Sequence, residues 1–229
     1  VHSDIDLLIV YEKIDGYNSE LIIEKLFYLA LDSGLKLGHR VHETNDLFKA
    51  SNEDITIKTS LMESRFITGS PFTWNETSRQ LNYIRLHQQR EFILAKIEEA
   101  QIRRKKYPTS MQPHIKESVG GLRDAQLIFW IAQTIYGVGT LKDLTGQLFS
   151  EEEYREYRMA LELLFRVRSA LHLIHGKQED RLLLDSMPQI TTMLGFKETK
   201  KMATQVLKAQ WRINNFTQIF VKKMVRPFI

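Results

Sequence analysis

Two aspartates near the start of the chain have the type and spacing of a divalent-metal site. Asp4 and Asp6 are separated by Ile5, at the beginning of the apolar run 5–10. If this run is a strand, alternation places both carboxylates on one face and points Ile5 and Leu7 toward the core. Neighbouring carboxylates repel each other unless a cation lies between them, and Mg²⁺ commonly combines one or two carboxylates with substrate phosphates. Because a D-x-D pair also arises often by chance, the alternative is an incidental pair at the surface.

A third carboxylate would complete a two-metal site. Glu63 lies in residues 55–67, an apolar, β-branched run that predicts a strand. A neighbouring strand could carry Glu63 to the aspartates. Arg65 would share its face, so an exposed ion pair is the alternative. Asp54 is the competing carboxylate, but the polar stretch 51–54 predicts a solvated turn.

A pair of glycines suggests a second chemical site. Gly120 and Gly121 stand just before a helical pattern that begins at Leu122. Glycines let the backbone approach a ligand closely, and a helix N-terminus offers free N–H groups to an anion. Lys116 and Arg123 add positive charge on either side. The segment predicts a phosphate contact, and the alternative is a flexible connection between helices with a few surface charges.

The aspartates and Glu63 need a small sheet to position them. Strands are predicted at 5–10, 35–41 and 55–67, with a helix at 20–32 between the first two. A strand, a helix and a further strand in this order are typical of an α/β unit. Residues 1–72 are therefore expected to form a small α/β part.

The rest of the chain is predicted to be helical. A long helix after Pro71 would begin at a capping box made by Thr73 and Glu76 and end in the basic run 103–106. Further helical patterns occupy 122–136, 150–176 and about 198–225. The sequence thus predicts an α+β fold, with the α/β part at 1–72 followed by a larger all-helical domain at 73–229.

Composition narrows the function classes. The 229 residues carry 32 Lys+Arg, 28 Asp+Glu and no cysteine, for a formal charge of +4. A chain without cysteine has no disulfide, thiol nucleophile, iron–sulfur cluster or Cys-based zinc site, and a cytoplasmic location is expected. No apolar stretch approaches the roughly 20 residues of a membrane span. The chain starts at Val1 rather than Met, so we expect a fragment. A helix C-terminus explains the run 103–106 better than nucleic-acid binding.

The remaining polar residues have ordinary explanations. His172 and His175 lie three apart on a predicted helix with apolar neighbours. A buried, hydrogen-bonded histidine is expected there rather than a metal ligand. The arginines of residues 155–168 are expected to form a solvated helix face or to pair with nearby glutamates.

Several segments in this order resemble the bacterial protein-PII uridylyltransferase/uridylyl-removing enzyme family of the DNA-polymerase-β-like nucleotidyltransferase superfamily. The segments are HSDIDLL (2–8), LGHRV (37–41), SLMESR (60–65), IKE with GGLRD (115–117, 120–124), RVRSALHL (166–173) and EDRLL (179–183). The resemblance covers nearly the whole chain and implies that residues 1–72 form a partial nucleotidyltransferase domain with a mixed β-sheet. It departs from the family at Ser118-Val119, where a glycine-containing pair is usual, and the family's glycine-rich turn before the His-Ser-Asp motif is absent.

The resemblance implies a role for individual residues. Asp4, Asp6 and Glu63 match the catalytic, metal-binding carboxylates, which hold two Mg²⁺ ions. The residues that match the nucleotide-binding positions are Ser3, Lys116, Gly120, Gly121, Arg123 and Asp124.

The resemblance also implies a reaction and its partners. A nucleoside monophosphate, UMP from UTP in this family, is transferred to a hydroxyl of the PII nitrogen-signalling protein. Two alternatives remain open. One is a regulatory or binding module of the same fold without catalysis in this fragment, and the other is a related transferase with another substrate.

Overall fold

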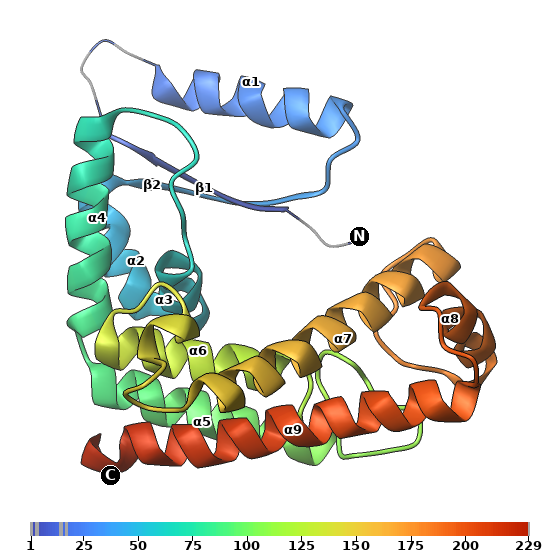
Figure 1. The fold of residues 1–229 in the computed structure, drawn as a ribbon. Helices are drawn as coiled ribbons and strands as arrows, with labels where there is room; N and C mark the ends of the chain where they lie inside the picture. Colours follow the sequence, from blue (N-terminus) through green and yellow to red (C-terminus); the bar gives the residue numbers. More distant parts are fainter. Residues whose placement is uncertain (1, 3–4, 14–15, 17, 229) are drawn as a thin grey trace. The chain divides into compact units, whose positions relative to one another are not determined.

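The computed structural model describes residues 2, 5–13, 16 and 18–228, which form two compact units (Figure 1). One unit spans residues 3–88, and the other comprises residues 89–229 with residues 1–2. Strands followed by a largely helical remainder confirm the α+β prediction. The expected boundary at residue 72 falls at the start of α4 (Pro71–Leu86), and the structure groups α4 with the first unit.

The first unit contains a two-stranded parallel sheet. β1 (Ile5–Tyr11) pairs with β2 (Leu37–Glu43), with Ile5 opposite Leu37 and Asp6 opposite Gly38. Helix α1 (Ser19–Asp32) connects the strands, as parallel pairing requires. It contacts the sheet through Phe27, whose ring centroid lies 4.0 Å from that of His39.

Three helices pack against the other face of this sheet. They are α2 (Leu47–Glu53), which follows the short 3-10 turn η1 (Thr44–Asp46), α3 (Ile55–Met62) and α4. Leu8 and Val10 pack there against Leu47 and Leu61, which are almost fully buried. This is the face of Asp6, since side chains two apart share a face. The expectation that Ile5 points into the core is wrong, because its side chain is 48% exposed.

The segment predicted as a third strand is helical. Helix α3 occupies residues 55–62, so the described sheet has two parallel strands and is not mixed. Asp54 caps this helix, and its carboxylate accepts a hydrogen bond from the Thr56 N–H at 2.6 Å. Ile57 and Leu61, one helical turn apart, both pack into the core of this unit. An aspartate followed by i, i+4 apolar spacing is the signal that the strand interpretation missed.

The long helix predicted after Pro71 is divided in two. α4 ends at Leu86, and α5 (Gln89–Lys106) begins after Gln88, which has φ of +47°. The Lys58 ammonium donates a hydrogen bond to the His87 carbonyl at this break. Helix α4 begins at an N-cap formed by Ser70, not at the predicted capping box of Thr73.

The second unit is a helical assembly around one core. Its helices are α5, α6 (Leu122–Tyr136), α7 (Glu151–His175), α8 (Met187–Met193) and α9 (Thr199–Val225), with the 3-10 turns η2 (Leu141–Leu144), η3 (Leu184–Ser186) and η4 (Arg226–Phe228). Helix α9 packs along α6 and α7, and Ile128, Leu164 and Ile213 of these helices are fully buried. Across the part of the chain that the structure describes, each helix is too short or too polar to cross a bilayer.

Candidate functional site

The Asp6 side chain extends over a glycine in the neighbouring strand. Asp6 is exposed and stands directly opposite Gly38. A Cβ atom at position 38 would lie only 2.7 Å from Asp6 Oδ1. Gly38 therefore leaves the space in which this carboxylate lies. Ser3 and Asp4 fall outside the described residues.

Glu63 lies at the end of a helix and not in a strand. It is the exposed C-cap residue of α3, and its N–H donates to the Thr59 carbonyl at 3.1 Å. Within the described ranges, which omit Asp4, no cluster of three or more His, Asp or Glu side chains could hold a metal ion. Asp6 still offers an exposed carboxylate oxygen, the donor type that Mg²⁺ prefers. The metal-binding roles of Asp4, Asp6 and Glu63 stay predictions.

The glycine turn has no free N–H groups for a phosphate. The backbone N–H groups from Gly120 to Asp124 all donate inside the turn at 2.7–3.0 Å, to Asp124 Oδ2 and to the carbonyls of Ser118, Ile115, Lys116 and Gly121 in that order. The expectation of unoccupied donors at this helix N-terminus is therefore wrong. The turn satisfies its own donors because it folds back on residues 115–118.

The two glycines are needed for packing of the turn itself. Gly120 has φ of +73°, and a Cβ there would lie 1.8 Å from the backbone oxygen of Gln210 in α9. A Cβ at Gly121 would lie 2.7–2.8 Å from the carbonyl oxygens of Ile115, Lys116 and Ser118. The close approach that these glycines permit is thus made to the protein's own backbone.

Asp124 holds this turn to helix α5. Its side chain is fully buried and lies 2.5 Å from Arg103 Nη2 and 3.0 Å from Arg104 Nη2. Two of the four cations in the basic run therefore pair inside the helical unit. With no exposed surface, Asp124 shapes the turn and cannot touch a nucleotide in this conformation.

Lys116 and Arg123 are the partly exposed cations of the turn. Arg123 Nη1 donates to Gln126 Oε1 at 2.8 Å, and its guanidinium lies 5.9 Å from the ring centroid of Trp130. The Arg123 Nε atom is 3.8 Å from a Glu117 carboxylate oxygen, too far for a strong ion pair. Both cations keep solvent-accessible surface with which to contact an anion.

A buried ion-pair cluster anchors the segment before the turn. Arg168 Nε donates to Asp180 Oδ1 at 2.6 Å, and His172 Nε2 lies 3.0 Å from the same oxygen. The backbone of Asp180 in turn accepts from the Ile115 N–H at 2.7 Å. No local pattern in the sequence indicates this cluster, because Arg168 is expected on a solvated helix face or paired with a nearby glutamate, and its partner is Asp180. The expectation for His172 is confirmed, because it is fully buried and hydrogen-bonded.

Asp180 is expected to stabilise the helical unit at neutral pH and to lose this effect in acid. Burial raises the pKa of its carboxyl group, but hydrogen bonds from Arg168 and His172 and the charge of Arg168 outweigh burial, so that the pKa falls from 3.8 to about 2. A lowered folded-state pKa stabilises the fold above the unfolded-state pKa, and the effect disappears as pH falls through the folded-state value. Between pH 5 and pH 2 the free energy of unfolding, measured with urea, should therefore fall by about 2 kcal/mol more in the wild type than in Asp180→Asn. Parallel pH profiles for the two proteins would contradict this.

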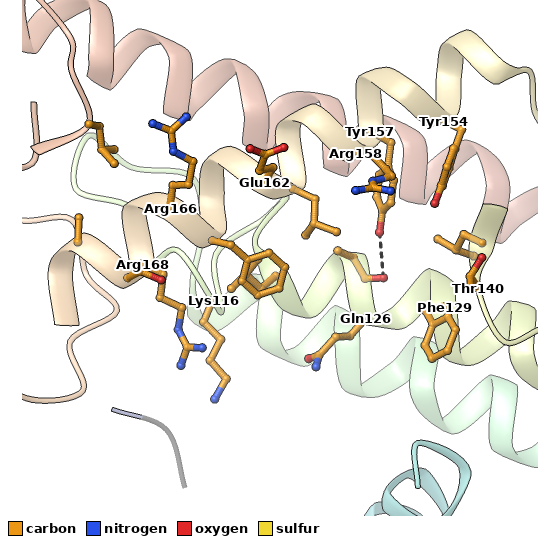
Figure 2. Close-up of a pocket in the computed structure, with 18 of the residues that line it drawn as sticks. Lys116, Gln126, Phe129, Thr140, Tyr154, Tyr157, Arg158, Glu162, Arg166 and Arg168 are labelled. Carbon is orange, nitrogen blue, oxygen red and sulfur yellow. Dashed lines mark hydrogen bonds between the residues drawn. The ribbon is translucent and has the colours of Figure 1, made fainter. Parts of the chain in front are cut away.

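An open groove lies between α6 and α7, next to Lys116. This α6–α7 groove has a volume of about 860 Å³, and apolar side chains that include Phe129, Leu161 and Phe165 line it (Figure 2). Lys116, Arg158, Arg166 and Arg168 also line it. Sequence reasoning missed the groove. Its one available signal was the apolar i, i+4 spacing of Leu161 and Phe165 beside a row of arginines.

This α+β chain has a strand–helix–strand start and a helical remainder. Comparison with known proteins identifies its family. A sequence model of the GlnD PII-uridylyltransferase family matches residues 91–221. The chain belongs to this family, as the resemblance of its motifs predicted.

Curated relatives support the same family. The chain is 33% identical to a protein of Ruegeria pomeroyi over 97% of the chain and 26% of that relative. It is 38% identical to one from Hydrogenovibrio crunogenus over 84% of the chain and 22% of the relative. A Pseudomonas fluorescens relative is 35% identical over 93% of the chain and 24% of its own length. All three are named bifunctional uridylyltransferase/uridylyl-removing enzyme, and the chain spans about a quarter of their length.

Proposed function

We propose that this chain is part of a nucleotidyltransferase that moves UMP from UTP to a hydroxyl group of a PII-like signalling protein. The family match over residues 91–221 carries this proposal. The exposed Asp6 carboxylate beside Gly38 supports it, because a metal ligand must be accessible to its ion.

The proposal assigns distinct tasks to the two groups of residues. Asp4, Asp6 and Glu63 would hold two Mg²⁺ ions, and Glu63 would also accept the proton of the attacking hydroxyl. When bound, the ions supply positive charge that stabilises the attacking and leaving oxygens at the α-phosphate, from which pyrophosphate departs.

The remaining residues act on the nucleotide. Lys116 and Arg123 supply charge for the triphosphate, and Ser3 contacts the nucleotide. Gly120, Gly121 and Asp124 maintain the shape of the turn that carries Lys116 and Arg123.

The test measures transfer of label from each of the four α-labelled nucleoside triphosphates to PII by the complete gene product with Mg²⁺. The wild type should label PII from UTP, and Asp6→Asn should lower the rate at least tenfold. Glu63→Gln is measured separately. The matched control is Glu53→Gln, a change at another exposed glutamate that should leave the rate of label transfer unchanged. Equal labelling by wild type and Asp6→Asn would end the assignment of Asp6.

Gly38→Ala is expected to reduce transfer without weakening the fold. Its backbone angles are not in the left-handed region, so alanine introduces no backbone strain. The new Cβ would, however, displace the Asp6 carboxylate from its place 2.7 Å away. We expect at least a tenfold lower transfer rate and a change below about 1 kcal/mol in the free energy of unfolding. A variant with full activity would show that Asp6 does not act from this position.

A nucleotide-binding module without catalysis is the second candidate. This candidate is the regulatory or binding module of the same fold that lacks catalysis. The occupied N–H groups of the glycine turn favour it over a transferase, because a transferase must hold the triphosphate and these groups are one expected set of phosphate contacts. Calorimetric titration of the chain with UTP, with and without Mg²⁺, separates the two. Binding without any label transfer by the complete gene product would support the module.

A further inference from the structure

The α6–α7 groove exposes several large apolar side chains. Phe165 is 50% exposed, Leu173 is 57% exposed and Met193 is 51% exposed, and all three line it. Contiguous exposed apolar surface of this kind marks interaction sites in soluble proteins. The aromatic and aliphatic side chains that line the groove lie between α6 and α7 in Figure 2.

The groove is elongated. Its lining on α7 extends from Tyr154 to Leu173, a separation of 19 positions and therefore about 29 Å along the helix axis. Leu161 and Phe165 lie between these ends on the same face. This length corresponds to about five helical turns and exceeds what a single nucleotide-sized ligand can cover. An apolar channel of this shape is typical of helix-in-groove recognition.

The charged residues that line the groove indicate which kind of helical ligand is complementary to it. Arg158 and Arg166 project from α7 two turns apart, and Lys116 lies on the opposite side toward α6 (Figure 2). Among the described residues, Glu162 is the single acidic one in the lining. Within the part of the chain that the structure describes, neither Arg158 nor Arg166 forms an ion pair, whereas Arg168 is paired with Asp180. Positive charge on both sides of an apolar floor complements a helix with acidic residues on both sides of an apolar stripe.

We propose that the α6–α7 groove is a docking site for an amphipathic helix with acidic flanks, contributed by a separate polypeptide. The apolar stripe of the helix packs on Leu161, Phe165 and Leu173. Its carboxylates lie beside Arg158 and Arg166 on one side and Lys116 on the other. This proposal is independent of the transferase reaction.

The experiment uses three fluorescein-labelled 18-residue peptides and the full chain. The first has leucines at helical i, i+3, i+4, i+7 spacing with glutamates on both flanks. The second replaces each glutamate with lysine, and the third is a scrambled form of the first. Binding is measured by fluorescence anisotropy. The glutamate peptide should bind at least tenfold more tightly than either of the others.

Charge reversal supplies the decisive comparison. Arg158→Glu with Arg166→Glu should weaken the glutamate peptide at least tenfold and make the lysine peptide the tighter ligand. Lys208→Glu with Arg212→Glu, which makes the same charge change at exposed positions of α9 outside the groove, should leave the order unchanged. Misfolding cannot produce an inverted preference, and circular dichroism monitors the fold. Equal binding of the scrambled peptide, or the same loss in both double variants, would overturn the proposal.

Discussion

Gly120→Ala is expected to destabilise the helical unit by about 3–5 kcal/mol, which is among the largest effects that a single methyl group can have. The added Cβ would lie 1.8 Å from the Gln210 oxygen and 2.5 Å from its carbonyl carbon. These are backbone atoms of α9, so they cannot rotate away as a side chain would. Residue 120 also has φ of +73°, which costs an L-amino acid a further 1–2 kcal/mol, roughly.

Alanine substitutions at two other glycines separate the cost of the steric clash from the cost of the backbone strain. Gly176 has φ of +61° with nothing within 4 Å of a Cβ, so Gly176→Ala should cost only the backbone strain of about 1–2 kcal/mol. Gly139 has open space and ordinary backbone angles, so Gly139→Ala should be neutral or slightly stabilising. Urea unfolding followed by circular dichroism measures all three. If Gly120→Ala cost no more than Gly176→Ala, the glycine turn would not be pressed against α9 as described.

Asp124→Asn is expected to cost about 3–5 kcal/mol of unfolding free energy, because it removes the charge that balances two largely buried guanidinium groups. Asp124 has no exposed surface, and the side chains of Arg103 and Arg104 are only 11% and 19% exposed. Asparagine keeps the shape and can still accept from the Gly120 N–H. The loss therefore reports the ion pairs and not a cavity.

An exposed ion pair provides the matched comparison. Lys201 Nζ lies 3.2 Å from Glu198 Oε1, but the two side chains are 67% and 57% exposed. Glu198→Gln should therefore change the unfolding free energy by no more than about 1 kcal/mol. The same urea titration serves both variants. Similar losses for the two would mean that burial does not set the strength of the Asp124 pairs.

The helices with strong local signals could be predicted from the sequence. The pattern for 122–136 coincides with α6, and those for 150–176 and 198–225 match α7 and α9 within a residue at each end. Helix α7 begins with a capping box made by Ser150 and Glu153 and ends at Gly176, so its limits depend on neighbours in the chain. The motifs that indicated the family also lie in continuous segments, and the family match confirms the assignment that they predicted.

Segments with competing signals could not be predicted in this way. The residues of α3 are apolar and β-branched enough to predict a strand. The capping of their backbone by Asp54 and the packing of Leu61 stabilise a helix instead. The break between α4 and α5 has neither glycine nor proline. Lys58, almost 30 residues earlier, binds the carbonyl of His87 at that break, a contact that no local pattern encodes.

For this chain, local spacing and capping residues determined the α+β class and the principal helices, and the apolar neighbours of His172 indicated its burial. The resemblance of ordered motifs indicated the family. Only the tertiary structure decided that the N–H groups of the turn at Gly120 form hydrogen bonds within the turn and that Asp180 pairs with Arg168 and His172. It also decided that α6 and α7 leave an apolar groove flanked by basic side chains. The physical reason is that helix periodicity and caps involve residues within one or two turns of each other. Ion pairs, backbone contacts and grooves depend on which distant segments pack together, and the hydrophobic effect that drives this packing is not directional.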